Sequence, residues 1–291
     1  MTTIKKSPVA GIMTVADMMQ PKDLIEHVQR LESIGHGSAW LPDIFGREIY
    51  VTAGFILHHT TKIKVASGIA HMYGRDAICS SQAARTLSEL SGGRFIQGLG
   101  VSNTIASEMR GIPWENPVQK TRDYVNALRG PLPIMAPAVY EPVPIYIAAH
   151  GPKMLAVAGE VADGANTYMQ TPEHTTHARG LVGANKVLNV VLPCCLTTDP
   201  AIGRAVGRAM VSIYLPLPAY QRQWASQGFD ESDWTNGGSD RLVDTYVAWG
   251  SIESIRNRMR EHIDAGANSI IMAAGGYSPE NSWELLEATA P

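Results

Sequence analysis

Short apolar runs alternate with amphipathic stretches along most of the chain. The amphipathic stretches carry apolar residues at the three- and four-residue spacing of a helix, while the runs have the length of buried strands. Strand and helix alternate about eight times, which predicts an α/β fold, a parallel (β/α)8 TIM barrel rather than an open sheet. The strands are expected at residues 9–13, 38–41, 63–70, 95–99, 145–149, 165–169, 187–196 and 268–273.

The stretch 83–103 shows this alternation most clearly. Ala83, Leu87 and Leu90 lie on one face of a helix, which the following glycine pair ends. The strand at 95–99 then enters the glycine-rich turn 98–103. Because ligands bind at the carboxyl ends of parallel strands, this turn is a candidate phosphate site. A turn that merely needs glycine for its geometry is the alternative.

One region breaks the alternation. Residues 216–240 contain several aromatic side chains and a glycine pair, and they predict an insertion with short helices. The prolines between 131 and 144 predict a surface connection rather than a domain linker. A barrel needs about 250 residues, so we expect a single domain over residues 1–291.

Composition and charge exclude several classes of function. The 45% hydrophobic and 18% charged fractions are typical of a globular protein with a sizeable core. A net charge of −3 without a basic block argues against nucleic acid as a partner. No apolar run approaches the ~18 residues of a membrane span, and the N-terminus has no signal-peptide pattern. The three cysteines lack metal-site or redox-motif spacing, which favours a reducing cytoplasm.

A second candidate anion site follows the strand at 145–149. His150-Gly151-Pro152-Lys153 opens a helix, whose free backbone amides attract anions, and Lys153 adds a positive charge. A helix simply started by proline is the alternative. Two such turns on one rim favour a phosphorylated ligand. Asn103 occupies the third glycine position of a dinucleotide fingerprint, which argues against that motif.

Polar residues also gather at the predicted strand ends. These are catalytic positions in a barrel, although each residue alone is more typical of one that orients its neighbours. The residues are Asp43, His71, Tyr73, His150 and Tyr168. Neither His58-His59 nor the pair His174 and His177 has a partner that would complete a metal site, so we predict no metal.

Three segments carry a family resemblance. LSGGRFIQGLGVS, PIYIAAHGPKMLAVAGEVADGA and GGSDRLVDTYVAWGS resemble the bacterial luciferase-like superfamily, above all its short coenzyme F420-dependent oxidoreductases of actinobacteria. The resemblance covers nearly the whole chain. It implies a barrel with an insertion, a homodimer, and a deazaflavin or flavin at the carboxyl ends of the strands.

The resemblance also implies roles for particular residues. A bulge in the third strand, often with a non-proline cis peptide, supports one face of the ring and should be Gly68-Ile69. Asp43 matches an acidic residue near the ring. The cofactor phosphate is expected at the turn Gly100, Val101 and Ser102 and at the turn Gly151, Pro152, Lys153 and Met154.

The sequence departs from the family pattern at three positions. Ile44 stands where the sugar-phosphate and alcohol dehydrogenases of the superfamily carry a histidine, and Asn103 replaces a glutamate. His150 stands where close relatives tend to carry an aliphatic residue. The acid–base pair of the alcohol-oxidising members is therefore missing.

The expected activity is hydride transfer between C5 of coenzyme F420 and a small organic substrate. Candidate proton donors are His71, Tyr73 and His150. Two alternatives remain open: an FMN-dependent luciferase-like monooxygenase, and a flavin-binding barrel without catalytic activity.

Overall fold

Parallel strands close into a ring in the computed structural model, which describes residues 7–131 and 142–291. Around the ring the order is β10-β1-β2-β3-β5-β6-β7-β8, and β10 pairs with both β1 and β8. The predicted TIM barrel is therefore confirmed. The ring strands are β1 (Val9–Met13), β2 (Ser38–Leu41), β3 (Lys64–Ser67), β5 (Phe95–Gly100), β6 (Ile145–Ala148), β7 (Gly164–Tyr168), β8 (Val187–Leu196) and β10 (Ser269–Gly275).

The third strand is shorter than predicted. The strand expected at 63–70 is interrupted at Gly68, where an isolated glycine within a strand predicts a bulge: β3 ends at Ser67 and the chain resumes as β4 (Ala70–His71), which pairs with β5. The peptide bond between Gly68 and Ile69 is cis, so the predicted bulge with a cis peptide is confirmed there. A β-carbon on Gly98 of β5 would overlap the Ser67 carbonyl oxygen, which explains the glycine in that strand.

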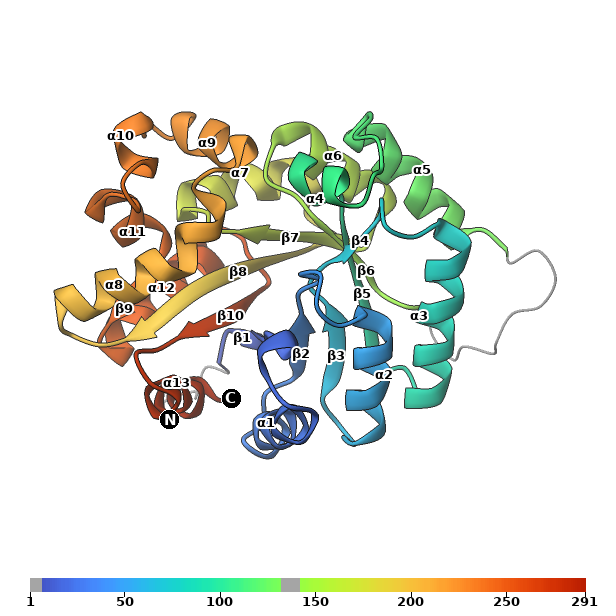
Figure 1. Ribbon diagram of the computed structural model, residues 1–291, viewed down its shortest axis with the longest axis horizontal. Coiled ribbons are helices and arrows are strands. Elements are labelled where there is room, and N and C mark those ends of the chain that lie inside the picture. Colours follow the sequence, from blue (N-terminus) through green and yellow to red (C-terminus); the bar gives the residue numbers. More distant parts are fainter. Residues whose placement is uncertain (1–6, 132–141) are drawn as a thin grey trace.

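Helices surround the strands on the outside (Figure 1). They are α1 (Pro21–Ser33), α2 (Ile49–His58), α3 (Ala77–Ser91), α4 (Thr104–Met109), α5 (Pro117–Arg129), α6 (Pro152–Val161), α7 (Pro172–Val182), α8 (Pro200–Val211), α12 (Ile252–Asp264) and α13 (Pro279–Thr289). Helices α4 and α13 and the short strand β9 (Ala248–Gly250) are not predicted from the sequence. Within the described ranges, no helix has the length and apolar character needed to cross a membrane. The proline-rich connection predicted at 131–144 falls mostly outside the described residues.

Apolar side chains fill both sides of the barrel wall. The main core lies between the strands and the helices; Leu24, Val28 and Leu31, for example, form the fully buried face of α1. A smaller cluster around Trp40 fills the barrel interior, where the Trp40 ring stacks on Tyr146 at 6.2 Å between ring centroids. The lumen is thus packed. Strands β7, β8 and β10 carry a hydrogen-bonded polar group, Asn166, Asn189 and Ser269, and the candidate site residues lie at the carboxyl ends of the strands.

The insertion forms its own apolar cluster beside the barrel. Short helices predicted within 216–240 are confirmed as α9 (Pro218–Ala225) and α10 (Glu231–Trp234), and α11 (Asp240–Tyr246) follows them. These helices appear at the upper left of Figure 1. Trp224 is fully buried and packs with Tyr246 and with Met169, which follows β7. The insertion is therefore anchored to the rim of the barrel.

Asp233 connects α10 to the start of α11 through hydrogen bonds. Its carboxylate accepts hydrogen bonds from the Asp230 amide, the Ser239 hydroxyl and the Arg241 guanidinium. The Arg241 hydrogen bond is the main cause that lowers the pKa of Asp233 from 3.8 to about 2. A lowered pKa means that this carboxylate stabilises the fold fully above pH 3.8 and loses its contribution as the pH falls towards 2.

We expect Asp233→Asn to lower the free energy of unfolding at neutral pH by about 1–2 kcal/mol. The difference from wild type should shrink as the pH approaches 2, and urea denaturation at several pH values measures it. Asp264→Asn changes an exposed aspartate of α12 and serves as the control. A pH-independent loss of stability in Asp233→Asn would contradict this account.

Candidate active site

Four neighbouring strands bring the predicted residues to one rim. Asp43 follows β2, His71 ends β4, Gly100 ends β5 and His150 follows β6. Strands β2, β3, β5 and β6 are consecutive in the ring, and β4 pairs with β5 with His71 beside Gly100. Because all are parallel, these residues share the carboxyl-terminal edge, where barrel proteins bind their ligands.

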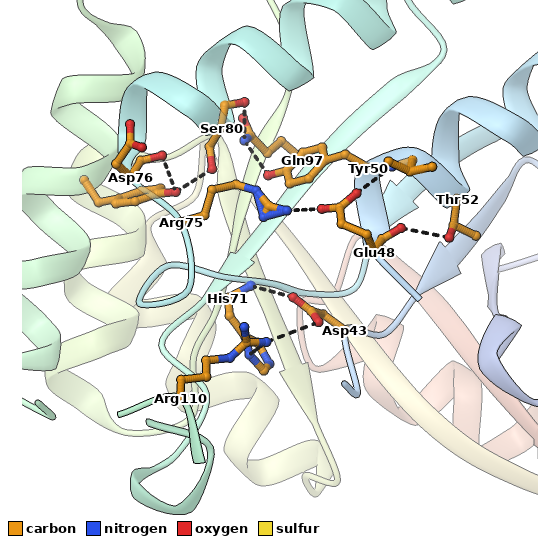
Figure 2. A network of polar contacts seen from close by, with 12 residues as sticks. Asp43, Glu48, Tyr50, Thr52, His71, Arg75, Asp76, Ser80, Gln97 and Arg110 are labelled. Atoms are coloured by element: carbon orange, nitrogen blue, oxygen red, sulfur yellow. Dashed lines mark hydrogen bonds and ion pairs between the residues drawn. The ribbon is translucent and has the colours of Figure 1, made fainter. Parts of the chain in front are cut away.

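Asp43, His71 and Arg110 form a polar cluster at this edge (Figure 2). The Asp43 carboxylate accepts a hydrogen bond from the His71 backbone amide at 3.3 Å and lies 3.7 Å from the Arg110 Nη2 atom. The same Nη2 lies 3.3 Å from His71 Nδ1. Arg110 also covers the Phe45 ring, with its guanidinium carbon 4.7 Å from the ring centroid. The cluster thus connects the ends of β2, β4 and α4.

The contact with Arg110 fixes the protonation of His71. A guanidinium can only donate, so Nδ1 accepts and the proton of the neutral imidazole lies on Nε2. Burial lowers the pKa of His71; Asp43 opposes this effect and Arg110 reinforces it. His71 is therefore a neutral hydrogen-bond donor at neutral pH. Sequence reasoning missed Arg110 because it caps α4, a six-residue helix without a clear apolar face.

Tyr73 points to a neighbouring loop. Its hydroxyl donates to the Glu115 carbonyl at 2.6 Å, and its ring stacks on Trp114 with 5.1 Å between centroids. Burial is the main cause that raises the pKa of Tyr73. The hydroxyl proton is thus engaged with the backbone, while the suggested catalytic role of Tyr73 stays a prediction.

The turn after β5 contains residues with structural roles, such as Gly100 and Asn103, next to the half-buried Val101 and Ser102. A β-carbon on Gly100 would lie 2.7 Å from Ile69 Cδ1, so this glycine makes room for the Ile69 side chain. Val101 and Ser102 are half-buried, and Ser102 has a positive φ of 63°. The Asn103 side chain accepts from the Ala106 amide at 3.0 Å and caps α4. Asn103 therefore has a structural role where the family resemblance implies a glutamate.

The turn before α6 is open. Gly151 is the N-cap of α6, has no capping side chain, and its hypothetical β-carbon would meet no atom within 4 Å. Pro152 and Lys153 are exposed and Met154 is half-buried. Pro152 has no N–H and the Met154 amide donates to the Gly151 carbonyl at 3.1 Å, so the amides of Gly151 and Lys153 are the donors that this uncapped helix start offers to a phosphate group. The residues present here therefore fit the phosphate of a flavin-type cofactor.

His150 lies between this turn and the insertion. Its ring is 5.3 Å from that of Tyr220, which continues into a tyrosine cluster with Tyr214 and Tyr168. Burial is the main cause that lowers the pKa of His150 to about 4, so the imidazole is neutral. Burial also raises the pKa of each of these tyrosines, which keeps their hydroxyls protonated.

Two hollows are lined by other residues than those of the polar cluster and the two turns. One, of about 580 Å³, lies within the insertion beside Leu215 and Trp234. The other, of about 450 Å³, lies between α7, α11 and α12 and is lined by charged residues such as Arg258. Neither contains a residue predicted for the site. We therefore place the candidate site by the strand ends and not by the size of a hollow.

The fold is that of a (β/α)8-barrel protein, and its candidate site lies at the carboxyl ends of the strands. The chain belongs to the luciferase-like monooxygenase family, whose sequence profile matches residues 3–269. It is 26% identical to the 5,10-methylenetetrahydromethanopterin reductase of Methanolobus tindarius, over 90% of this chain and 94% of the relative. The predicted class, an oxidoreductase of the luciferase-like family, is thus confirmed.

Solved structures share the fold over nearly the whole chain. The coenzyme F420-dependent tetrahydromethanopterin reductase from Methanopyrus kandleri has a TM-score of 0.74 at 18% identity and covers 97% of both chains. The oxygenating constituent of 3,6-diketocamphane monooxygenase from Pseudomonas putida, in complex with FMN, has a TM-score of 0.72 at 15% identity and covers 98% of this chain and 97% of that one. Proteins of this fold thus include one whose name gives coenzyme F420 and one whose structure contains FMN.

Proposed function

We propose that this protein is a coenzyme F420-dependent oxidoreductase that moves a hydride between C5 of the deazaflavin and a small organic substrate. The observation that carries the proposal is the open, uncapped start of α6 at Gly151, on the rim that also holds His71 and His150. The name of the relative from Methanopyrus kandleri supports F420 as the cofactor.

The chain offers a distinct set of residues for each part of the cofactor. Gly151 to Met154, with Val101 and Ser102, would hold the phosphate. The Gly68-Ile69 peptide would lie against one face of the ring, and Asp43 would lie near it. The bound deazaflavin supplies the carbon that gives or takes the hydride.

The imidazoles of His71 and His150 are suited to donate a hydrogen bond to a substrate. His71 and His150 are neutral at neutral pH. Asp43 accepts from the backbone amide of His71, and among the described residues no carboxylate is hydrogen-bonded to either imidazole ring. Ile44 is 45% exposed and Asn103 caps α4, so neither replaces the acid–base pair of the alcohol-oxidising relatives. These features favour reduction of the substrate over oxidation of an alcohol.

Turnover with each cofactor tests this proposal. Purified protein is mixed with reduced F420 and a panel of enones, imines, nitroaromatics and alcohols, and the return of oxidised F420 is followed by absorbance. A parallel series uses reduced FMN and oxygen. We expect F420 oxidation with at least one substrate class. Tight FMN binding with oxygen consumption and no F420 binding would favour a monooxygenase, and cofactor binding without any turnover would favour a non-catalytic barrel.

We also propose that the protein is a homodimer. Val51 and Phe55 on α2 are 72% and 39% exposed, and Ile78 on the adjacent α3 is 49% exposed, so an apolar face is available for a second copy. Light scattering after size exclusion should give a dimer for wild type and a monomer for Val51→Lys. Ile213→Lys, at an exposed apolar residue between α8 and α9, should remain dimeric. A monomeric wild type would contradict the proposal.

We further propose a cytoplasmic location. Its support is that Cys79, Cys194 and Cys195 are all free thiols, Cys79 being exposed. Exposed free thiols persist where the compartment is reducing. Fractionation of cells that make the natural protein, followed by immunodetection, tests this location.

A further inference from the structure

Gln170 is a buried amide at the junction between the barrel rim and the insertion. It lies just beyond β7, is 1% exposed, and contacts side chains from two other parts of the chain, His150 on one side and Gln223 and Gln227 on the other. A buried amide side chain has two donor hydrogens and an acceptor oxygen that need partners. The identity of those partners decides which way the amide faces.

The Tyr168 carbonyl oxygen fixes the orientation of Gln170. A carbonyl can only accept, and it lies 3.1 Å from Gln170 Nε2, so this nitrogen is the donor. The opposite atom, Oε1, accepts from the side-chain amides of Gln223 and Gln227 at 3.1 and 3.2 Å. Gln227 is oriented in turn by the Tyr246 hydroxyl, which donates to its Oε1 at 2.6 Å. The hydrogen bonds therefore run in one direction, from α11 to the rim.

The second hydrogen on Gln170 Nε2 reaches His150. The distance from Nε2 to His150 Nδ1 is 3.3 Å, and because Nε2 donates, Nδ1 accepts. In a neutral imidazole the proton then lies on Nε2. The backbone of His150 is held as well, since its carbonyl accepts from His174 Nε2 at 2.9 Å. Within residues 7–131 and 142–291, the titratable groups that face the His150 ring are His174 and Tyr220, and neither is a carboxylate that would draw a second proton onto the ring.

We propose that Gln170 is a positioning residue that fixes His150 as the neutral tautomer with its proton on Nε2, so that His150 donates a hydrogen bond to the substrate. The catalytic part of this inference rests on the proposed function. A donor at the rim suits a ketone or an enone. When the hydride and its electron pair add to carbon, the C=O π pair moves to oxygen, the resulting oxyanion is stabilised by the N–H, and it takes its proton from solvent.

Nitrogen NMR of the cofactor-free protein tests the tautomer directly. Long-range ¹H–¹⁵N spectra separate the two neutral tautomers, and comparison with His150→Gln identifies the His150 signals among the nine histidines. We expect a protonated Nε2 and an unprotonated Nδ1 at neutral pH. A protonated Nδ1 in wild type would overturn the inference without the need for any further variant.

Gln170→Glu tests the role of the amide. A carboxylate only accepts, so it should draw a proton onto Nδ1 and raise the pKa of His150 from about 4 to above its ordinary 6.5. The matched control is Gln97→Glu, which makes the same change at a glutamine that is 2% exposed and bonded to Tyr50. The control should leave the His150 spectrum unchanged. An unchanged His150 in folded Gln170→Glu would contradict the inference.

Kinetics separate this inference from the proposed function. With reduced F420 and a ketone or enone, Gln170→Glu should lower kcat by about 10- to 100-fold, by analogy with residues that orient metal-bound histidines through a hydrogen bond to the ring. The KM for reduced F420 should stay the same. If wild type has the expected tautomer but no F420 activity, the proposed function fails and the positioning role stands. If F420 activity is present but Nδ1 carries the proton, only the positioning role fails.

Discussion

Gly151→Val should weaken F420 binding by about 10- to 100-fold while the protein stays folded. The backbone of Gly151 has φ −78° and ψ 156°, values that any residue adopts, and a β-carbon there would meet no atom within 4 Å. The valine methyl groups would instead fill the space before the amides of α6. Hydrogen bonds to a charged group contribute about 1.5–3 kcal/mol, which corresponds to the expected loss of affinity.

Fluorescence titration with F420 measures this loss, and a thermal melt shows whether the variant is folded. Gly180→Val is the control, because Gly180 is an exposed glycine of α7 whose β-carbon would also meet no atom within 4 Å. It should bind F420 like wild type. If Gly151→Val binds F420 as tightly as the control does, the phosphate does not lie at this turn.

Gly98→Ala should lower the free energy of unfolding by about 3 kcal/mol or more. The added β-carbon would overlap the carbonyl oxygen of Ser67, a backbone atom that cannot rotate away, and would lie 3.4 Å from the Trp40 ring. Relief of this overlap requires β3 and β5 to move apart. Because Ser67 directly precedes Gly68, the same movement should disturb the surface proposed for the cofactor ring.

Urea denaturation of Gly98→Ala measures the loss of stability. Gly180→Ala, an exposed helical position, should be neutral or slightly stabilising, because alanine has the higher helix propensity. Equal denaturation midpoints for Gly98→Ala and wild type would show that the barrel wall tolerates a β-carbon at position 98.

Most of the barrel could be predicted because each strand is a short apolar run between turn residues. The strand β8 matches the predicted residues 187–196, and the ring contains every strand that was expected. The third strand is interrupted at Gly68, where an isolated glycine inside the apolar run indicates the bulge that ends β3. Strand β9 has three residues and α4 has six, which is too short for a periodic pattern to be recognised.

The part of the candidate site that lies within one short segment could be predicted from the sequence. The sequence Gly-Pro-Lys after a strand indicates an open helix start by itself, and Gly151 has that geometry. Arg110 and the hydrogen-bonded glutamines were missed because their partners are remote in sequence. Gln170 and Gln223 are 53 positions apart in the sequence, and Arg110 and His71 are 39 positions apart. Only the folded chain brings such groups together, so spacing carries no signal for them.

A crystal structure of the protein soaked with F420 tests the central claim most directly. We expect the deazaflavin ring against the Gly68-Ile69 peptide at the carboxyl ends of the strands, with the phosphate at the amides that open α6 and His71 and His150 facing the ring. Density for F420 in the hollow beside Trp234, or no density at a concentration that saturates binding in solution, would contradict the account.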